Sequence, residues 1–314
     1  MILKLYSLLM GTMLLSGGCY QSPFSGLEEE IKPGTHEPVY DYYSLKTTDA
    51  YDSTGMPLGK VSQHEISGIS LSRPCPNRIW AIDDSGNGPY LYLFDAETAQ
   101  TRCVYYLGNL QNIDWEEMSS IQGPGEEPGL LIGDIGNNSR NRKVLTLYRL
   151  KEPACDCDSD KEIEISAAFE KIDFVYPAGT HDAEAMFVDD ETGDIYIIAK
   201  DQPRSGVYRL SYPQDTEKTD TLTYLGSLPF PLVVSADYMP DENKLIVKTY
   251  DQIFLWENVE NKNVSELIFD IPLNAPYNPP ELQGESIAIA GEGYYTLSEK
   301  VFLWEPVLYF YKKK

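Results

Sequence analysis

The chain alternates short apolar runs with polar turns along most of its length. Runs of about 5 to 8 residues rich in β-branched and aromatic side chains are separated by Gly, Pro, Asn and Asp, and no long segment has helical periodicity. This pattern predicts an all-β protein: a sandwich, a barrel or a propeller. Because a propeller repeats its strand groups, we searched the sequence for a period.

One short motif recurs about every 50 residues. It reads "SGISL", "EMSSI", "EAMFV", "SADYM" and "ESIAI" in turn. The first residues of these motifs are Ser67, Glu117, Glu184, Ser235 and Glu285. The interval from Glu117 to Glu184 is longer, 67 residues, and contains an acidic insertion around "CDCDSDKE" (155–162). The motif therefore marks the start of five similar units.

Each motif is followed by further strand-like runs. A second and a third run come after every motif, and a fourth closes the first four units: "CVYYLGN" (103–109), "KIDFVYP" (171–177), "TLTYLGS" (221–227) and "ELIFDIP" (266–272). The fifth unit lacks a fourth run, and "PVYDYYSL" (38–45) is available to supply it. Five units of four antiparallel strands, closed by an N-terminal strand, predict a five-bladed β-propeller. Six blades and a double sandwich are the alternatives.

The first strand of each blade lines the propeller axis. The five motif heads should therefore form a ring that contains three carboxylates and no Lys or Arg. Such a ring must take up protons or bind a cation. Oxygen ligands suit Ca²⁺, whereas zinc favours His or Cys, and only His181 lies nearby. We predict an axial Ca²⁺ held by Ser67, Glu117, Glu184, Ser235 and Glu285. A water-filled channel with raised carboxylate pKa values is the alternative.

The starts of the first strands and the ends of the second strands meet at one end of the channel, which we call the mouth. The polar residues expected there include Asp83, Asp84, Asp114, Glu116, Asp134, Arg140, Arg142, His181, Asp182, Lys200, Lys248, Tyr250 and Lys300. Loops from several blades converge at such a mouth and often bind ligands. Its cations could hold an anionic group. In a hydrolase, Asp83, Asp134 or Asp182 would act as general base, with Arg140 or Lys200 stabilising the transition state.

The N-terminus has the pattern of an export signal. Lys4 precedes the apolar run Leu5–Leu15, and "LLSGGC" ends at Cys19. We expect residues 1–18 to be a lipoprotein signal peptide, Cys19 to be lipidated, 19–37 to be a tether and 38–314 to be the propeller. A plain secretory peptide is the alternative. Tyr20, in place of an Asp after Cys19, favours the outer membrane or cell surface over the inner membrane.

The remaining four cysteines are Cys75, Cys103, Cys155 and Cys157. Export permits disulfides, and four cysteines allow three pairings. All four fall on the face opposite the mouth. A bond between Cys155 and Cys157 would be strained, so we expect Cys75–Cys103 and leave the other two open.

The composition limits the class of partner. The chain has 49 acidic residues and 25 basic ones, which argues against nucleic acid. We expect a monomer that binds an anionic small molecule or an envelope macromolecule and touches the membrane through its lipid anchor alone.

Four stretches resemble known propeller families. "DWEEMSSI", "GDIGNNSRNRKVLTLYRL", "HDAEAMFVDDETGDIYIIAK" and "GESIAI" resemble a family of bacterial secreted propeller proteins, which implies the fold and no particular activity. The order of ring residues is more remotely similar to that of the calcium-activated nucleotidases, or soluble apyrases. This second resemblance implies an axial Ca²⁺ held by Ser and Glu. Ser85 stands where that family has an Arg after its paired Asp, which places nucleotidase activity in doubt.

Two functions follow from these observations. The first is a binding module with an axial Ca²⁺ and no turnover. The alternative is a Ca²⁺-dependent hydrolase of phosphoesters or esters at the mouth. The sequence favours the binding module because it contains no complete catalytic constellation, neither a nucleophile elbow nor a P-loop.

Overall fold

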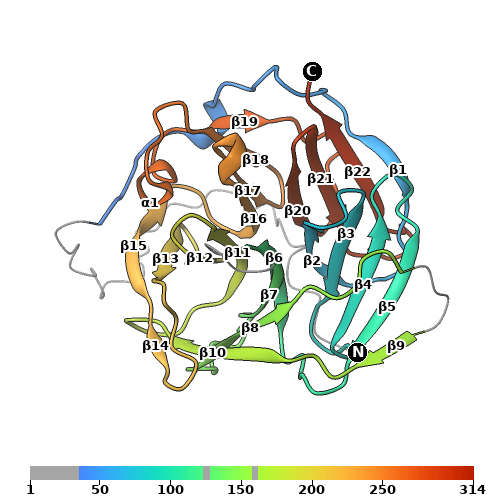
Figure 1. Cartoon of the computed structure of the whole chain (residues 1–314). Helices are drawn as coiled ribbons and strands as arrows, with labels where there is room; N and C mark the ends of the chain where they lie inside the picture. Colours follow the sequence, from blue (N-terminus) through green and yellow to red (C-terminus); the bar gives the residue numbers. More distant parts are fainter. Residues whose placement is uncertain (1–34, 123–127, 158–161) are drawn as a thin grey trace, which may run out of the picture. The chain divides into compact units, whose positions relative to one another are not determined.

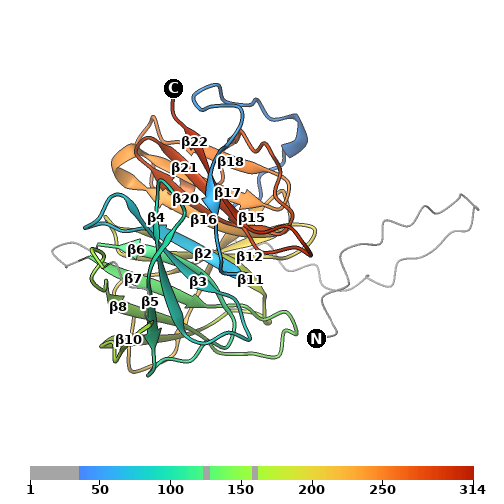
Figure 2. The same ribbon diagram turned by 90° about the vertical axis from the view of Figure 1, so that its right-hand side faces the viewer.

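Five antiparallel sheets form a ring, and the protein is an all-β, five-bladed β-propeller (Figure 1). The structure is a computed structural model that describes residues 35–122, 128–157 and 162–314. Residues 34–314 form one compact unit. The inner strands of the five sheets contact one another in the order β2, β6, β11, β16, β20 and back to β2, which closes the ring. Figure 2 shows the same blades from the side.

The five blades follow the chain in order. Blade 1 contains β2 (Ile66–Leu71), β3 (Arg78–Asp83), β4 (Tyr90–Asp95), β5 (Thr101–Leu107) and β9 (Glu162–Ile165). Blade 2 contains β6 (Trp115–Ile121), β7 (Gly129–Asp134), β8 (Leu145–Lys151), β10 (Phe169–Val175) and β14 (Asp220–Thr221). Blade 3 contains β11 (Ala183–Asp189), β12 (Asp194–Ala199), β13 (Ser205–Leu210) and β15 (Thr223–Leu228).

The last two blades complete the ring. Blade 4 contains β16 (Val233–Met239), β17 (Lys244–Thr249), β18 (Ile253–Glu257) and β19 (Leu273–Ala275). Blade 5 contains β20 (Gly284–Ala290), β21 (Gly293–Ser298), β22 (Val307–Lys312) and β1 (Met56–Lys60). The described helices are short: η1 (Tyr42–Ser44), η2 (Pro240–Glu242) and α1 (Val264–Leu267). Among the described residues, no helix has the length and apolarity needed to cross a bilayer.

Alternate side chains of each central strand pack into two different interfaces. In β12, Ile195 and Ile197 join a cluster with blade 2, whereas Tyr196 and Ile198 join one with blade 4. A strand buried on both faces reads as a nearly continuous apolar run, because successive side chains point to opposite sides. This explains why the second runs of the repeat are so uniformly hydrophobic.

The ring closes through β1, which pairs antiparallel with β22. Closure by an N-terminal strand is as expected, but the predicted segment, 38–45, is wrong. That segment contains η1, and its aromatic side chains Tyr40 and Tyr42 pack against the core between blades 3 and 4. Asp41 caps the turn by accepting a hydrogen bond from the Tyr43 amide at 3.1 Å. The alternating aromatic residues of 38–45 therefore arise from packing outside the sheet and not from strand pairing.

The outer edges of the first four blades each receive a further parallel partner. β9 pairs with β5 and β14 pairs with β10, while single bridges join His36 to Gly226 and Thr47 to Asn274. Figure 1 shows the N-terminal chain, in blue, running along the outside toward β1. These additions cover edges that would otherwise be open to pairing with another chain.

Two other expectations need correction. "ELIFDIP" is not the fourth strand of blade 4, since α1 begins in its place at Val264 and the strand β19 follows at Leu273. The disulfides join Cys75 to Cys155 and Cys103 to Cys157, with Cα–Cα distances of 6.1 and 6.2 Å, so the pairing Cys75–Cys103 is wrong. The segment after β8 returns to blade 1 and brings both of its cysteines beside that blade.

We predict that β1 is essential to the fold. A chain that begins at Gly34 should melt like the longer chain, whereas one that begins at Val61 should lose cooperative unfolding because β22 loses its only outer partner among the described strands. Circular dichroism melting of the two proteins tests this. Similar melting temperatures would contradict the assignment of β1 as the closing strand.

Candidate functional site

Each inner strand carries one extra residue close to the mouth. The register between the first and second strands shifts at the same place in all five blades. The extra residues, in blade order, are Ser67, Glu116, Glu184, Val234 and Glu285. β-Bulges of this kind redirect a side chain and are common beside functional sites. In this register, Glu117 and Ser235 lie one residue deeper than the sequence alignment placed them.

The deeper layer is held by hydrogen bonds across the axis. Glu117 accepts hydrogen bonds from the Ser235 hydroxyl and from the Ala236 amide at 3.2 Å, which ties blade 2 to blade 4. The Met118 amide donates to its other oxygen at 3.0 Å. The Ser235 hydroxyl also accepts from the Ile287 amide of blade 5. Both Glu117 oxygens are thus occupied by protein donors.

Blade 1 joins the same layer through Ser67. Its hydroxyl donates to the Trp115 carbonyl at 2.9 Å, and its own carbonyl accepts from the Ser286 hydroxyl at 3.1 Å. These bonds connect blade 1 to blades 2 and 5. Hydrogen bonds that involve side chains therefore join blades 1, 2, 4 and 5 around the axis.

Nearer the mouth, Glu184 and Glu285 share one network. Lys200, which follows β12, forms an ion pair with Glu184 and donates to the Tyr250 hydroxyl at 2.7 Å. Tyr250 in turn donates to Glu285 at 2.9 Å. Burial favours loss of the Lys200 proton, but Glu184 and Glu285 outweigh it and raise the pKa of Lys200. Lys200, which follows the second strand of blade 3, thus supplies the positive charge that the ring positions lack.

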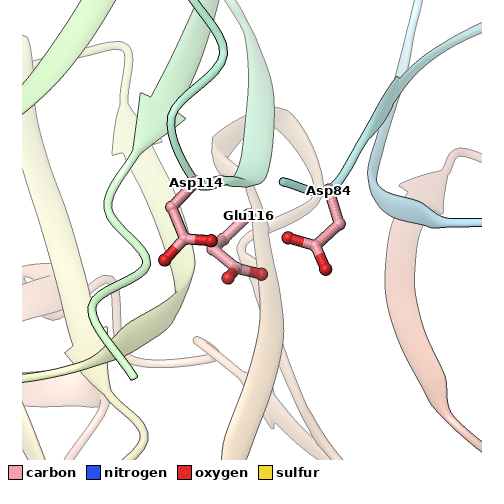
Figure 3. Close-up of side chains that lie close together, drawn as sticks. All are labelled: Asp84, Asp114 and Glu116. Atoms are coloured by element: carbon pink, nitrogen blue, oxygen red, sulfur yellow. The ribbon is translucent and has the colours of Figure 1, made fainter. Parts of the chain in front are cut away.

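Three further carboxylates converge at the mouth: Asp84, Asp114 and Glu116. One oxygen of each lies within 4.8 Å of the others. Figure 3 shows the three side chains pointing toward one another. Asp84 follows β3, Asp114 precedes β6, and Glu116 is the bulge residue of β6. Two blades therefore supply one acidic cluster, which we call the acidic triad.

Glu116 is the unusual member of this triad. It is 3 % exposed, and four other carboxyl groups surround it: Glu184, Asp84, Glu285 and Asp114. Burial, together with Glu184, Asp84 and Glu285, raises its pKa well above the usual range. Burial and Asp84 also raise the pKa of Asp114 to about 6. A buried carboxyl surrounded by other carboxyls requires a proton or a cation.

Gly136 packs directly against the triad and leaves no room for a side chain. A Cβ atom at this position would lie 2.4 Å from Glu116 Oε1 and 2.5 Å from Asp114 Oδ2. Any other residue would push into the two carboxylates. The backbone of blade 2 therefore approaches the triad closely on that side, and a glycine is required at this position.

The four cations predicted to hold an anion, Lys200 among them, are paired with carboxylates. Arg140 pairs with Asp201 at 2.8 Å and Arg142 with Asp134 at 2.7 Å. Lys300 pairs with Glu305 at 2.8 Å. Lys248 is fully buried, donates to the Gly284 and Thr249 carbonyls, and lies 4.5 Å from the centre of the Tyr277 ring. Burial lowers its pKa to about 8.

The three predicted bases differ in their surroundings. Asp134 is fully buried in its ion pair, and Asp182 accepts the Asn137 amide at 2.6 Å. Asp83 accepts the Tyr92 hydroxyl at 2.6 Å through one oxygen, while its other oxygen has no hydrogen-bond partner in the described chain. Burial raises the pKa of Asp83 to about 6. Asp83 is thus the most suitable of the three to accept a proton.

Sequence reasoning placed the acidic triad at the mouth but not among the metal ligands. The alignment matched Glu117 to the other heads because "EMSSI" looks like "ESIAI", and a bulge changes no letter of the sequence. The signal that could have distinguished the two was the pair "EE" at 116–117, of which only one can occupy the extra position.

We predict that Asp114 makes stability depend on pH. Its folded pKa, about 6, exceeds the unfolded value of about 3.9. The folded state therefore binds the proton more tightly, and stability falls as pH rises from about 4 to about 6. In EDTA, Asp114→Asn should raise the melting temperature by roughly 2 °C above pH 6 and have little effect at pH 4. An equal gain at pH 4 and pH 8, or a loss at pH 8, would contradict this account. Glu292→Gln, which removes an exposed carboxylate on the opposite face, is the control.

Comparisons with known proteins bear on the fold alone. No protein-family model matches the sequence, and no curated protein matches it. Among solved structures, the chain is similar to one in a nidogen–laminin complex, with 9 % identity, a TM-score of 0.40, and coverage of 74 % of this chain and 72 % of that chain. It is also similar to an auxiliary nutrient binding protein from Bacteroides thetaiotaomicron VPI-5482, with 12 % identity, a TM-score of 0.42, and coverage of 73 % and 47 %. Similarities of this size carry no argument about ligand or activity.

Proposed function

We propose that this protein is an exported propeller that binds a divalent cation, Ca²⁺ foremost, at the acidic triad and uses its mouth to bind an anionic ligand. Glu116 is the observation that carries the proposal. A carboxyl group that is 97 % buried among other carboxyl groups is costly unless a proton or a cation accompanies it. Asp84 and Asp114 supply further oxygens at the right spacing for one shared ion.

The donor set favours a hard cation. The triad offers only carboxylate oxygens, which suit Ca²⁺ and Mg²⁺ rather than zinc or copper. Ca²⁺ accepts more ligands and a less regular geometry than Mg²⁺, and waters can complete its shell.

The five ring residues of the sequence prediction have a supporting role in this proposal. Glu184 and Glu285, held by Lys200 and Tyr250, add negative potential behind the triad. Glu117, Ser235 and Ser67 hold the inner strands in register through their hydrogen bonds. We therefore assign the ion to the triad and not to the five ring residues of the sequence prediction; Glu116 occupies in blade 2 the bulge position that Glu184 and Glu285 occupy in their own blades.

The ligand class follows from the charges. Because Arg140, Arg142 and Lys300 are already paired, an anionic group would gain most by completing the shell of the cation itself. An anionic small molecule or an acidic envelope polymer fits this requirement. One such molecule per chain is expected, with the protein acting as a monomer.

Export and lipidation belong to the same proposal. Two disulfides are typical of an oxidising compartment and support export. Cys19 would carry the lipid, and residues 19–37 would tether the propeller to the outer membrane or the cell surface. Incorporation of a labelled fatty acid, lost in Cys19→Ser, tests this part independently.

We predict that Ca²⁺ raises the melting temperature and that Glu116 is required. Saturating Ca²⁺ should raise it by roughly 5 °C over EDTA, because the ion binds only the folded state. Glu116→Gln should abolish this shift while melting in EDTA at or above the wild-type temperature, since it removes a buried repulsion. Glu292→Gln is the matched control and should keep the shift. A shift retained in Glu116→Gln, or absent from the wild type, would refute the site.

A second candidate function is a Ca²⁺-dependent hydrolase of phosphoesters or esters. Asp83 favours it: one oxygen lacks a hydrogen-bond partner in the described chain, and the pKa is near 6. Asp83 also lines a pocket of about 430 Å³ together with His64, Glu65, Asn87 and Lys300. A bound cation would orient the anionic oxygen of a substrate. Asp83 would take the proton from the attacking water, and Lys200 or Arg140 would need to leave its partner to act on the transition state.

We predict that any such turnover depends on Asp83. Nucleoside di- and triphosphates, phytate, aryl esters and lactones are the substrates to assay with Ca²⁺ and with EDTA. Asp83→Asn should lower the rate about 100-fold, whereas Asp241→Asn, on the opposite face, should leave it unchanged. Turnover that persists in EDTA, or in Asp83→Asn, would exclude this mechanism. An absence of turnover on every substrate would favour the binding module.

A further inference from the structure

A tight turn between β21 and β22 presents three consecutive apolar side chains to solvent. Phe302 is 86 % exposed, Leu303 93 % and Trp304 67 %. Val301 and Trp304 form the bridge that closes the turn, with amide-to-carbonyl distances of 2.9 and 3.3 Å. We call residues 301–304 the apolar tip. Full exposure of three large apolar residues in a row normally marks an interaction site.

The tip differs from every other exposed apolar residue in the described chain. The others occur singly in the sequence: Val39, Tyr43, Met56, Ile113, Val144, Tyr212, Val259, Ile271 and Leu282. Scattered residues of this kind are ordinary on protein surfaces. Leu282 precedes β20 and so belongs to the same end of blade 5 as the tip. Apolar exposure is thus concentrated at the mouth end of one blade.

The backbone holds the tip in a defined conformation. Phe302 has a φ of 53°, a region that Gly or Asn adopts easily and that is unusual for an aromatic residue. At the base, Lys300 donates its amide to the His64 carbonyl at 2.7 Å and pairs with Glu305 at 2.8 Å. The turn is strained and fixed at its base, and the side chains at its end are exposed to solvent. Such a conformation keeps these side chains available for binding instead of packing them against the propeller.

We propose that the apolar tip inserts Phe302, Leu303 and Trp304 into the interfacial region of a lipid bilayer. This inference rests on the proposed lipid anchor, because the anchor keeps a bilayer within reach. Fifteen residues separate Cys19 from Gly34, and an extended chain of that length spans at most about 50 Å. Tethering raises the local concentration of the bilayer, so a small insertion suffices.

The shape and charge of the tip favour a bilayer over a protein groove. A two-residue hairpin end is convex, and lipid accommodates a convex apolar tip without a preformed pocket. Trp and Phe are well suited to the membrane interface. Lys60, His64 and Lys300 lie near Glu305 at its base, but Glu65 and Asp83 line the adjoining pocket, and the whole chain carries a formal charge of −24. Zwitterionic headgroups therefore match this end of the molecule better than anionic ones do.

Insertion would bring the mouth to the level of the headgroups. Phe302 lines the pocket that contains His64, Glu65 and Asn87, so the tip and the pocket share one end of blade 5. A ligand carried on the membrane surface would then meet the pocket without leaving the bilayer. The inference thus narrows the ligand of the proposed function to a membrane-associated anionic molecule.

Trp304 reports on insertion selectively. The chain has four tryptophans, and Trp80, Trp115 and Trp256 are buried, with at most 2 % exposure. Residues 34–314, which contain every described strand and both disulfides, should be mixed with phosphatidylcholine vesicles. We expect a blue shift in tryptophan emission, protection from acrylamide and quenching by brominated acyl chains. Trp304→Phe should remove all three changes and retain most of the vesicle binding.

Replacing Phe302, Leu303 and Trp304 together by Ser should weaken co-sedimentation with vesicles by at least about 10-fold, even if each side chain is only partly buried in the bilayer. Val259→Ser, which alters an 85 % exposed residue on the opposite face, should have no effect. Added anionic lipid should weaken binding at low salt, because the chain is strongly negative.

The proposal is overturned if vesicles leave Trp304 emission and quenching unchanged, or if the triple variant binds as well as the wild type. Protection of Trp304 by lipid-free envelope extract but not by vesicles would also overturn it, in favour of a protein partner. The triple variant should keep the Ca²⁺-dependent melting shift, so failure of the tip and failure of the cation site give different results. The vesicles are offered to a chain without Cys19, so the result does not depend on acylation.

Discussion

Five inner strands that converge on one axis exclude most water from the side chains between them, and every charged group there must find a partner. The deeper layer meets this requirement with neutral donors, as Glu117 is bound by a hydroxyl and two amides. The next layer meets it with Lys200, whose charge is shared between Glu184 and the Tyr250–Glu285 pair. Glu116 is a buried ring carboxylate crowded by other carboxyl groups, and burial and these charges raise its pKa well above the usual range. The structure therefore separates positions that hold the blades from a position that is available to a ligand.

This separation changes the role expected of a cation. An axial ion is not needed to join the blades, because hydrogen bonds through Glu117, Ser235 and Ser67 already connect blades 1, 2, 4 and 5. The ring is further secured by β1 and by two disulfides between blade 1 and the segment after β8. A cation at the triad would therefore contribute binding chemistry more than architecture. Its loss should weaken ligand binding more severely than it weakens the fold.

The repeat in the sequence was sufficient to predict the five blades and most of their strands. The repeat depends on the alternation of buried residues and turn residues. This alternation is a local property, so it can be recognised in the sequence. The errors concern features that depend on tertiary packing. The aromatic run at 38–45 resembles a strand, but its side chains pack on the outside of the ring. The disulfide pairing depends on the insertion after β8 returning to blade 1. No local pattern in the sequence shows where that insertion runs. The bulge in β6 gives Glu116 the position that the sequence alignment had assigned to Glu117. The alignment could not tell the two apart because they are adjacent glutamates.

The central claim is that Asp84, Asp114 and Glu116 share one divalent cation. The most direct measurement is an anomalous difference map from crystals grown with Ca²⁺, with crystals grown in EDTA as the reference. The account predicts one peak about 2.3–2.6 Å from an oxygen of each triad residue, with Glu117 still bonded to Ser235. A peak coordinated by Glu117 and Ser235 instead, or no peak within reach of Glu116, would contradict it.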